Sequence, residues 1–151
     1  MTDFKKISKD VFKIMWLPGE DEIIFHANNE SPLPLNTELY KQLNKYFDIE
    51  NWKNKYAEAY KEWLNDISNV IYDIRNDINM SIIDALTALN KELEFQVIYY
   101  WFDIDRTFTD GYLWEYCPIS GEKLIYLGEE YTRKNSLISP SYPIIFPYEP
   151  Q

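Results

Sequence analysis

One segment near the centre of the chain has a spacing of acidic residues that could support catalysis. Asp103-Ile104-Asp105-Arg106-Thr107 follows directly after five apolar or aromatic residues, 98–102. A carboxylate nucleophile needs a rigid strand end to hold it, and a second carboxyl group must reach the leaving oxygen to transfer a proton. The segment provides both groups two residues apart.

Residues 98–107 resemble the motif of haloacid-dehalogenase-type phosphatases, in which an apolar strand ends in D-x-D-x-T. The resemblance implies that Asp103 is the nucleophile, that Asp105 is the general acid and base, and that Mg²⁺ is bound. That family places the motif on the first strand of a parallel doubly wound sheet. Its other catalytic groups, a lysine and an acidic pair for magnesium, come from later strands.

The context of the motif argues against this function. Only residues 108–151 follow it, too few for the several βα units of such a sheet. Lys123 and the pair Glu129-Glu130 offer the right chemistry without the right spacing. We interpret Asp103-x-Asp105-x-Thr107 as a chance match in an aspartate-rich chain, and keep a Mg²⁺-dependent phosphatase-like enzyme as the alternative function.

The sequence predicts no metal site, no cofactor and no catalytic residue. Cys117-Pro118-Ile119-Ser120-Gly121 resembles half of a C-P-x-C-G zinc knuckle, with serine in place of the second cysteine. One cysteine and one histidine, His26, do not make a zinc set, and nothing in the sequence brings the two together. An EF-hand calcium loop fits Asp103 and Asp105 but fails at Thr107-Phe108.

The charge of the chain favours a basic partner. With 25 acidic and 15 basic residues, the formal net charge is −10. Such a field repels nucleic acids and anionic membranes and attracts basic proteins. The chain has no apolar run of membrane-spanning length and no secretory h-region at its start, so we expect a cytoplasmic protein.

Three acidic groups fall in predicted turns or strand ends: Glu20-Asp21-Glu22, then Asp103, Asp105 and Asp110, then Glu129-Glu130. We expect them to converge on one rim of a sheet beside exposed aromatic residues. Acidic groups steer a basic partner, and buried aromatic residues hold it. The candidate partner-binding residues are Asp103, Asp105, Asp110, Tyr112, Trp114, Glu129, Glu130 and Tyr131.

The first half of the chain predicts a hairpin followed by helices. Strands at 11–16 and 23–26 flank Leu17-Pro18-Gly19-Glu20, which suits a type II turn, and 27–34 is a loop. Apolar spacing predicts a first helix from Asn36 or Thr37 to Phe47 and a break at 48–51. A long helix then spans 52–78, with a kink near 65–69 as an option. A last helix is capped by Asn79 or Ser81 and ends near Leu93.

The aromatic row at helical spacing in the long helix is interpreted as core rather than as a stacking platform. It consists of Trp52, Tyr56, Tyr60 and Trp63.

The second half predicts strands at 95–102, 112–116 and 123–127, with a turn at 118–121. Four prolines between Ser136 and Gln151 argue against a helix or an internal strand there, so 136–151 is expected to be an extended tail. The prediction is one α+β domain over 1–151. Its small, mostly antiparallel sheet, an N-terminal hairpin plus a C-terminal meander, packs against two to three helices.

Two stretches, LPLNTELYKQLNKYFDIENW and ALTALNKELEFQVIYYWFD, resemble a pattern in small bacterial proteins. In these proteins a proline-bounded loop opens a helix, and an amphipathic helix runs directly into a V-x-Y strand. Small acidic, aromatic-rich chains of this kind resemble immunity proteins of bacterial toxin systems. The resemblance implies a non-catalytic immunity or antitoxin protein that blocks a basic toxin domain, often a nuclease. It transfers no functional residue. A nucleic-acid mimic and an oligomerising structural subunit are further hypotheses.

Overall fold

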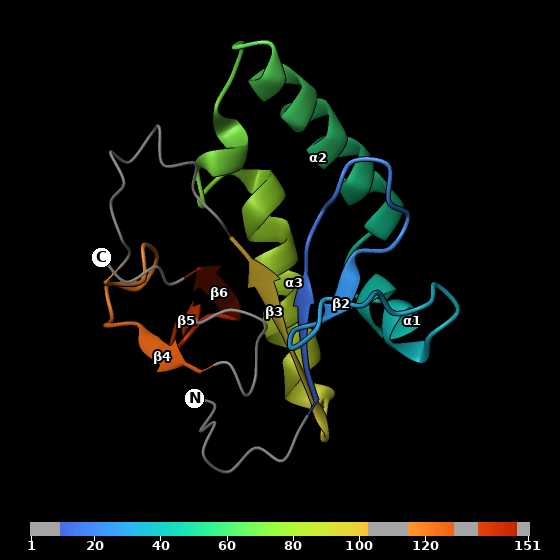
Figure 1. The fold of residues 1–151 in the computed structure, drawn as a ribbon, viewed down its shortest axis with the longest axis vertical. Helices are drawn as coiled ribbons and strands as arrows, with labels where there is room; N and C mark the ends of the chain where they lie inside the picture. The colour runs from blue at the N-terminus through green and yellow to red at the C-terminus, as the bar shows by residue number, and fades with distance from the viewer. Residues whose placement is uncertain (1–9, 103–114, 129–135, 148–151) are drawn as a thin grey trace.

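The computed structural model describes residues 10–102, 115–128 and 136–147, which form an α+β fold (Figure 1). A six-stranded mixed sheet has the strand order β2-β1-β3-β6-β5-β4. Its pairings are antiparallel for β1–β2, β4–β5 and β5–β6, and parallel for β1–β3 and β3–β6. The predicted α+β class and the mostly antiparallel sheet are confirmed. The strands are β1 Asp10–Ile14, β2 Ile24–His26, β3 Gln96–Trp101, β4 Ile125–Leu127, β5 Ser136–Ile138 and β6 Ile144–Pro147.

The N-terminal hairpin forms as the sequence predicts. β1 pairs with β2 through Ile14↔Ile24 and its neighbours. In the connecting turn Gly19 has φ +80, and the Glu20 N–H donates to the Leu17 carbonyl over 3.2 Å. A type II turn needs this positive φ at its third position, which glycine adopts without strain.

The long helix predicted over 52–78 ends at Leu64, and its last part is a connection that leads into α3. Helix α1 spans Glu38–Asn44, α2 spans Ile49–Leu64 and α3 spans Asp77–Glu92, with a short 3₁₀ turn, η2 Val70–Tyr72, between α2 and α3. Asp66, just after α2, has φ 56, outside the helical region. Asparagine, aspartate and serine bond to nearby backbone groups and so compete with the helix, and 65–69 contains all three types. The apolar period continues across the break because Trp52 of α2, Ile74 of the connection and Ile82 of α3 contribute to the same core.

The N-cap of α3 is Asn76, whose side chain accepts from the Ile78 N–H, and not the predicted Asn79 or Ser81. Asn79 is instead fully buried. Its amide donates to the carbonyls of Ile71 and Asp73 and accepts from the Tyr100 hydroxyl over 2.6 Å. Asn79 thus ties the α2–α3 connection to β3, which local sequence does not reveal.

The two faces of the sheet are packed differently. The main core combines side chains from all three α-helices with alternate sheet residues such as Phe12, Ile98 and Phe146. The opposite face carries a smaller cluster that includes Val11, Tyr99 and Ile145. Side chains alternate between faces along a strand, so both sides of β1, β3 and β6 bury apolar residues.

The proline-rich end of the chain is not a tail in its described part, which corrects the prediction for 136–151. β5 and β6 are sheet strands, and β6 lies between β3 and β5. Pro147 is the last residue of β6, and Pro140 and Pro143 lie in the turn before it. The prolines therefore stand at strand ends, where a missing N–H costs little, while Ile144, Ile145 and Phe146 keep their donors.

The predicted C-terminal meander is corrected in one respect. β3 pairs with β1 and β6, both parallel to it, and not with an antiparallel neighbour from 112–116. Of that predicted strand, 112–114 lie outside the described residues. The turn at 118–121 does reverse the chain: Leu124 N–H donates to the Glu115 carbonyl over 3.0 Å, Cys117 N–H donates to the Glu122 carbonyl over 2.7 Å, and Gly121 has φ +76.

Candidate partner-binding groove

All eight candidate partner-binding residues lie outside the described residues: Asp103, Asp105, Asp110, Tyr112, Trp114, Glu129, Glu130 and Tyr131. Their expected convergence stays a prediction. The described strands do fix where the chain leads into these segments. Parallel pairing of β1, β3 and β6, followed by two antiparallel steps to β4, makes β1, β3 and β4 run in one direction. Each of the three acidic groups thus follows a strand that ends at the same edge of the sheet.

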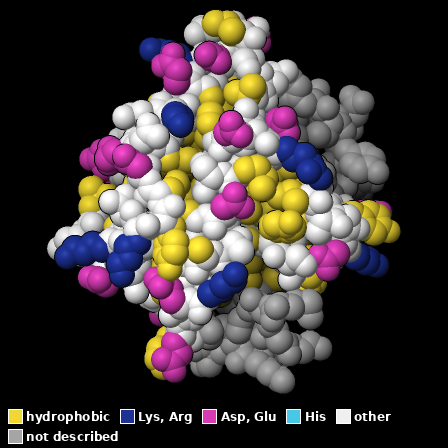
Figure 2. Space-filling view, turned by 180° about the vertical axis from the view of Figure 1, so that it is seen from behind, with side chains coloured by type: hydrophobic (Ala, Val, Ile, Leu, Met, Phe, Trp, Pro, Cys, Tyr) yellow, Lys and Arg dark blue, Asp and Glu magenta, His cyan; other side chains and the backbone are white. Residues whose placement is uncertain are grey.

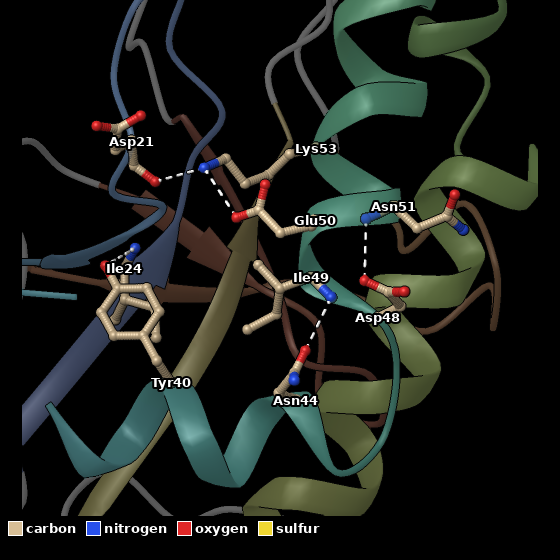
Figure 3. Close-up of polar contacts among 9 residues, drawn as sticks. All are labelled: Asp21, Ile24, Tyr40, Asn44, Asp48, Ile49, Glu50, Asn51 and Lys53. Atoms are coloured by element: carbon tan, nitrogen blue, oxygen red, sulfur yellow. Dashed lines mark hydrogen bonds and ion pairs between the residues drawn. The ribbon is translucent and has the colours of Figure 1, made fainter. Parts of the chain in front are cut away.

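The first acidic group, Glu20-Asp21-Glu22, lies in the described β1–β2 turn, and a groove of about 300 Å³ opens beside it. The turn, α1 and the first turns of α2 form its walls (Figure 3). The lining residues are Asp21, Leu35, Tyr40, Lys41, Asn44, Ile49, Glu50 and Lys53.

Tyr40 of α1 anchors the base of the groove. Its ring is buried, and its hydroxyl accepts from the Ile24 N–H over 3.2 Å and donates to the Leu33 carbonyl over 3.0 Å. Burial raises the pKa of Tyr40, as does the carboxylate of Glu22, against the lowering effect of the hydrogen bonds from the Ile24 and Ile23 backbone. The Tyr40 hydroxyl therefore stays un-ionised at neutral pH, and the side chain serves as a fixed wall of the groove and not as an acid.

Two caps hold the turn between α1 and α2. The Asp48 carboxylate accepts from the Asn51 N–H over 3.0 Å, and the Asn44 side-chain oxygen accepts from the Ile49 N–H over 3.0 Å. These bonds satisfy N–H groups that the first turn of a helix leaves unpaired. Ile49 is thereby fixed at the groove (Figure 3).

Lys53 joins α2 to the acidic turn. Its ammonium donates to the Asp21 backbone carbonyl over 2.8 Å and lies 3.5 Å from the Glu50 carboxylate. Figure 3 shows the Asp21 carbonyl directed at Lys53 and the Asp21 carboxylate directed away from it. The carboxylate of Asp21 at this rim is thus not engaged by Lys53.

The aromatic row of α2 packs inside the molecule, mainly against the β1–β2 turn. Trp52 is buried, and its indole N–H donates to the Ile78 carbonyl over 2.8 Å. Tyr56 and Tyr60 are half-buried, and each lies 5.1 Å from the Trp16 ring between centroids, with Tyr56 stacked on it. Trp63 is also half-buried and meets Tyr72 edge to face. The row's main contacts are therefore packing contacts.

The two soft side chains lie far apart. His26 is on β2 and packs on Phe12, whereas Cys117 precedes β4 at the opposite edge of the sheet. Burial acts to raise the pKa of Cys117, but hydrogen bonds from Ser120, Ser139 and the Ile119 backbone outweigh it and lower the pKa. Within 10–102, 115–128 and 136–147, no group of three His, Cys, Asp or Glu side chains could hold a metal ion.

Sequence reasoning missed the groove. Lys53 contacts a residue 32 positions earlier, a pairing that local sequence does not reveal. Of the contacts around the groove, only the Asp48-x-x-Asn51 cap could be expected from residues close together in the sequence. Comparison with family models, with curated proteins and with solved structures finds no match to this chain. None of the helices in the described part is long and apolar enough to span a membrane.

Proposed function

We propose that this protein is a non-catalytic cytoplasmic binding protein, an immunity or antitoxin protein that neutralises a basic bacterial toxin domain such as a nuclease. The net charge of −10 supports a basic partner, because the averaged field raises the rate at which such a partner is captured. Figure 2 shows acidic, basic and apolar side chains interspersed over the described part of one face of the molecule, a mixture that suits a protein partner better than a polymer of phosphates.

The groove carries the proposal. Leu35 and Ile49 offer apolar surface above the buried Tyr40 ring, and the Asp21 carboxylate stands at the rim with the Glu50 carboxylate, which pairs with Lys53. An arginine or lysine side chain matches both features, because its aliphatic stem can lie on apolar surface while its cationic head meets a carboxylate. A basic side chain of the toxin domain is the occupant that we propose.

The acidic segments at the same sheet edge would extend this interface. β3 ends two residues before Asp103, and β4 ends two residues before Glu129. The proposal therefore keeps Asp103, Asp105, Asp110, Glu129 and Glu130, with Tyr112, Trp114 and Tyr131, as a second contact region. Its test is the triple change of Asp103, Asp105 and Asp110 to Asn, which should weaken binding and flatten its salt dependence.

The direct test asks whether a toxin-like domain is encoded next to this chain and titrates an inactive variant of that domain by calorimetry. Leu35→Asp should weaken binding by about tenfold or more, since it places a charge on the apolar contact surface. Leu35 is 52% exposed, so the change should not disturb folding. Ile67→Asp is the matched control, because Ile67 is 71% exposed at the far end of α2.

Equal affinities of the Leu35 and Ile67 variants would remove the groove from the interface. If the chain neither binds the neighbouring product nor relieves its toxicity in cells, the immunity function itself is wrong.

One observation favours the alternative, a Mg²⁺-dependent phosphatase-like enzyme using Asp103-x-Asp105-x-Thr107. β3, which leads into the motif, has parallel neighbours on both sides, and open α/β sheets bind ligands at the carboxyl ends of such strands. Hydrolysis of an aryl phosphate with Mg²⁺, abolished by Asp103→Asn, would establish it. Absence of turnover across divalent metals would end it.

A further inference from the structure

A second cavity lies where β3 and β6 separate. Their pairing covers Tyr100↔Ile144 and Trp101↔Ile145, at the carboxyl half of β3. Next to the amino half of β3, the turn between β5 and β6 and the end of α3 enclose a cavity of about 320 Å³. This volume is at the lower end of the range of small-molecule pockets, roughly 300–1,000 Å³.

The β3 wall of the cavity is completed by one side chain of α3. The Asn90 amide accepts from the Ile98 N–H over 2.9 Å and donates to the Ile98 carbonyl over 2.9 Å. Both backbone groups of Ile98 on this side are therefore satisfied without a neighbouring strand. The β3 backbone beside the cavity therefore needs no further strand to satisfy its hydrogen bonds.

The opposite wall, the turn 139–143, is held by its own hydrogen bonds. The Ser139 hydroxyl oxygen accepts from the N–H groups of Ser141 and Tyr142, over 3.4 and 3.2 Å. The Ser139 N–H donates to the Ile144 carbonyl over 3.1 Å, and the Ser141 hydroxyl donates to the Glu122 carboxylate. The wall is thus formed before any ligand arrives, which lowers the entropic cost of binding.

The lining combines apolar surface, hydroxyl groups and one cation. Pro140 and the Tyr142 ring supply partly exposed apolar surface over the buried Val97 and Ile138, Thr87 and Tyr99 carry hydroxyls, and Lys91 carries the charge. Burial raises the pKa of Tyr99, so its hydroxyl stays neutral. Among the described residues that line the cavity none is acidic, although the chain has 25 acidic residues against 15 basic ones. The charge of the lining residues is therefore positive, whereas the net charge of the molecule is negative.

We infer that this cavity binds a small amphipathic monoanion, an aromatic or branched carboxylate, with its apolar body against Pro140 and Tyr142 and its carboxylate paired with Lys91. The inference is independent of the proposed partner groove, which is lined by a different set of residues. A dianion or a polyphosphate would find a single compensating charge and is disfavoured.

Two probes that differ only in charge test the inference: phenylacetate and phenylacetamide, titrated into the full chain and followed by ¹⁵N–¹H NMR. We expect saturable shifts at Asn90, Ser141 and Tyr142 with phenylacetate, at a dissociation constant on the order of 1 mM for so small a ligand. Phenylacetamide should bind about fivefold more weakly, as expected for one partly exposed ion pair.

Lys91→Gln should remove the difference between the probes, while the matched variant Lys55→Gln, on the exposed surface of α2, should keep it. Thr87→Trp should fill the cavity and abolish binding of both probes, with unshifted groove resonances showing that the variant is folded. The inference is overturned if neither probe gives saturable shifts at the cavity, if both probes bind equally, or if Lys91→Gln leaves the difference intact.

Discussion

Two strands in this protein have edge backbone groups that are bonded by a helical side chain. At β2, the segment 31–33 bonds the His26 N–H and the Ile24 carbonyl, and the Tyr40 hydroxyl of α1 bonds the remaining Ile24 N–H and reaches on to the Leu33 carbonyl. At the amino half of β3, the Asn90 amide of α3 bonds both the N–H and the carbonyl of Ile98. An unpaired buried backbone group costs about as much as a lost hydrogen bond, so Asn90 replaces a missing strand, whereas Tyr40 completes an edge that 31–33 already covers.

The two closures leave different spaces beside them. Tyr40 is long and aromatic, so it fills the room between α1 and β2, and the groove above it is a shallow surface of mixed charge. Asn90 is short, so the room between β3 and the 139–143 turn remains as a cavity that is partly open to solvent. The size of the closing side chain thus separates a surface suited to a protein from a cavity suited to a small molecule.

Removing Asn90 should have the largest effect. Asn90→Ala leaves two backbone groups of Ile98 without partners and should lower the free energy of unfolding by about 2–3 kcal/mol. Urea denaturation followed by circular dichroism measures it. Asn54→Ala, at an exposed position of α2, controls for the change in helix propensity. Equal stability of the two variants would mean that Asn90 does not act as a strand substitute.

Tyr40→Phe should have an intermediate effect, about 1–2 kcal/mol, because the ring still packs while the Ile24 N–H loses its acceptor. The same denaturation experiment applies. Tyr46→Phe, in the turn just after α1 and 38% exposed, is expected to stay within about 0.5 kcal/mol of the wild type. A Tyr40 variant as stable as the Tyr46 variant would show that the ring alone closes this edge.

Lys53→Met should have the smallest effect and lower the free energy of unfolding by no more than about 0.5 kcal/mol. The aliphatic stem is kept, and the lost ion pair to Glu50 is at the surface. Lys55→Met is the matched control on the same helix. Thermal unfolding at low and high salt provides the measurement. A salt-dependent loss of unfolding free energy well above 1 kcal/mol would mean that the charge of Lys53 stabilises the protein as much as the Tyr40 hydroxyl does.

Much of the local structure could be predicted from the sequence. Pro18-Gly19 specified the type II turn, because glycine alone tolerates its positive φ at little cost, and alternation with helical spacing located the hairpin, α1 and the end of α3. The prediction of one helix over 52–78 was wrong because apolar spacing continues through 65–76, where the chain leaves the helix, and Ile74 of that connection still packs in the core. The tail prediction was wrong because proline density was weighed without the positions of the prolines relative to strand ends.

The sequence by itself determined composition, charge, the turns and the type of most elements, since these depend on side-chain chemistry and on neighbours within a few residues. Only the tertiary structure decided that β6 enters the sheet beside β3, that Lys53 meets Asp21, and that Asn90 and Tyr40 close strand edges. Those contacts join segments whose meeting depends on how the whole sheet is ordered. The groove and the cavity both arise from that order, which is why neither was visible in the sequence.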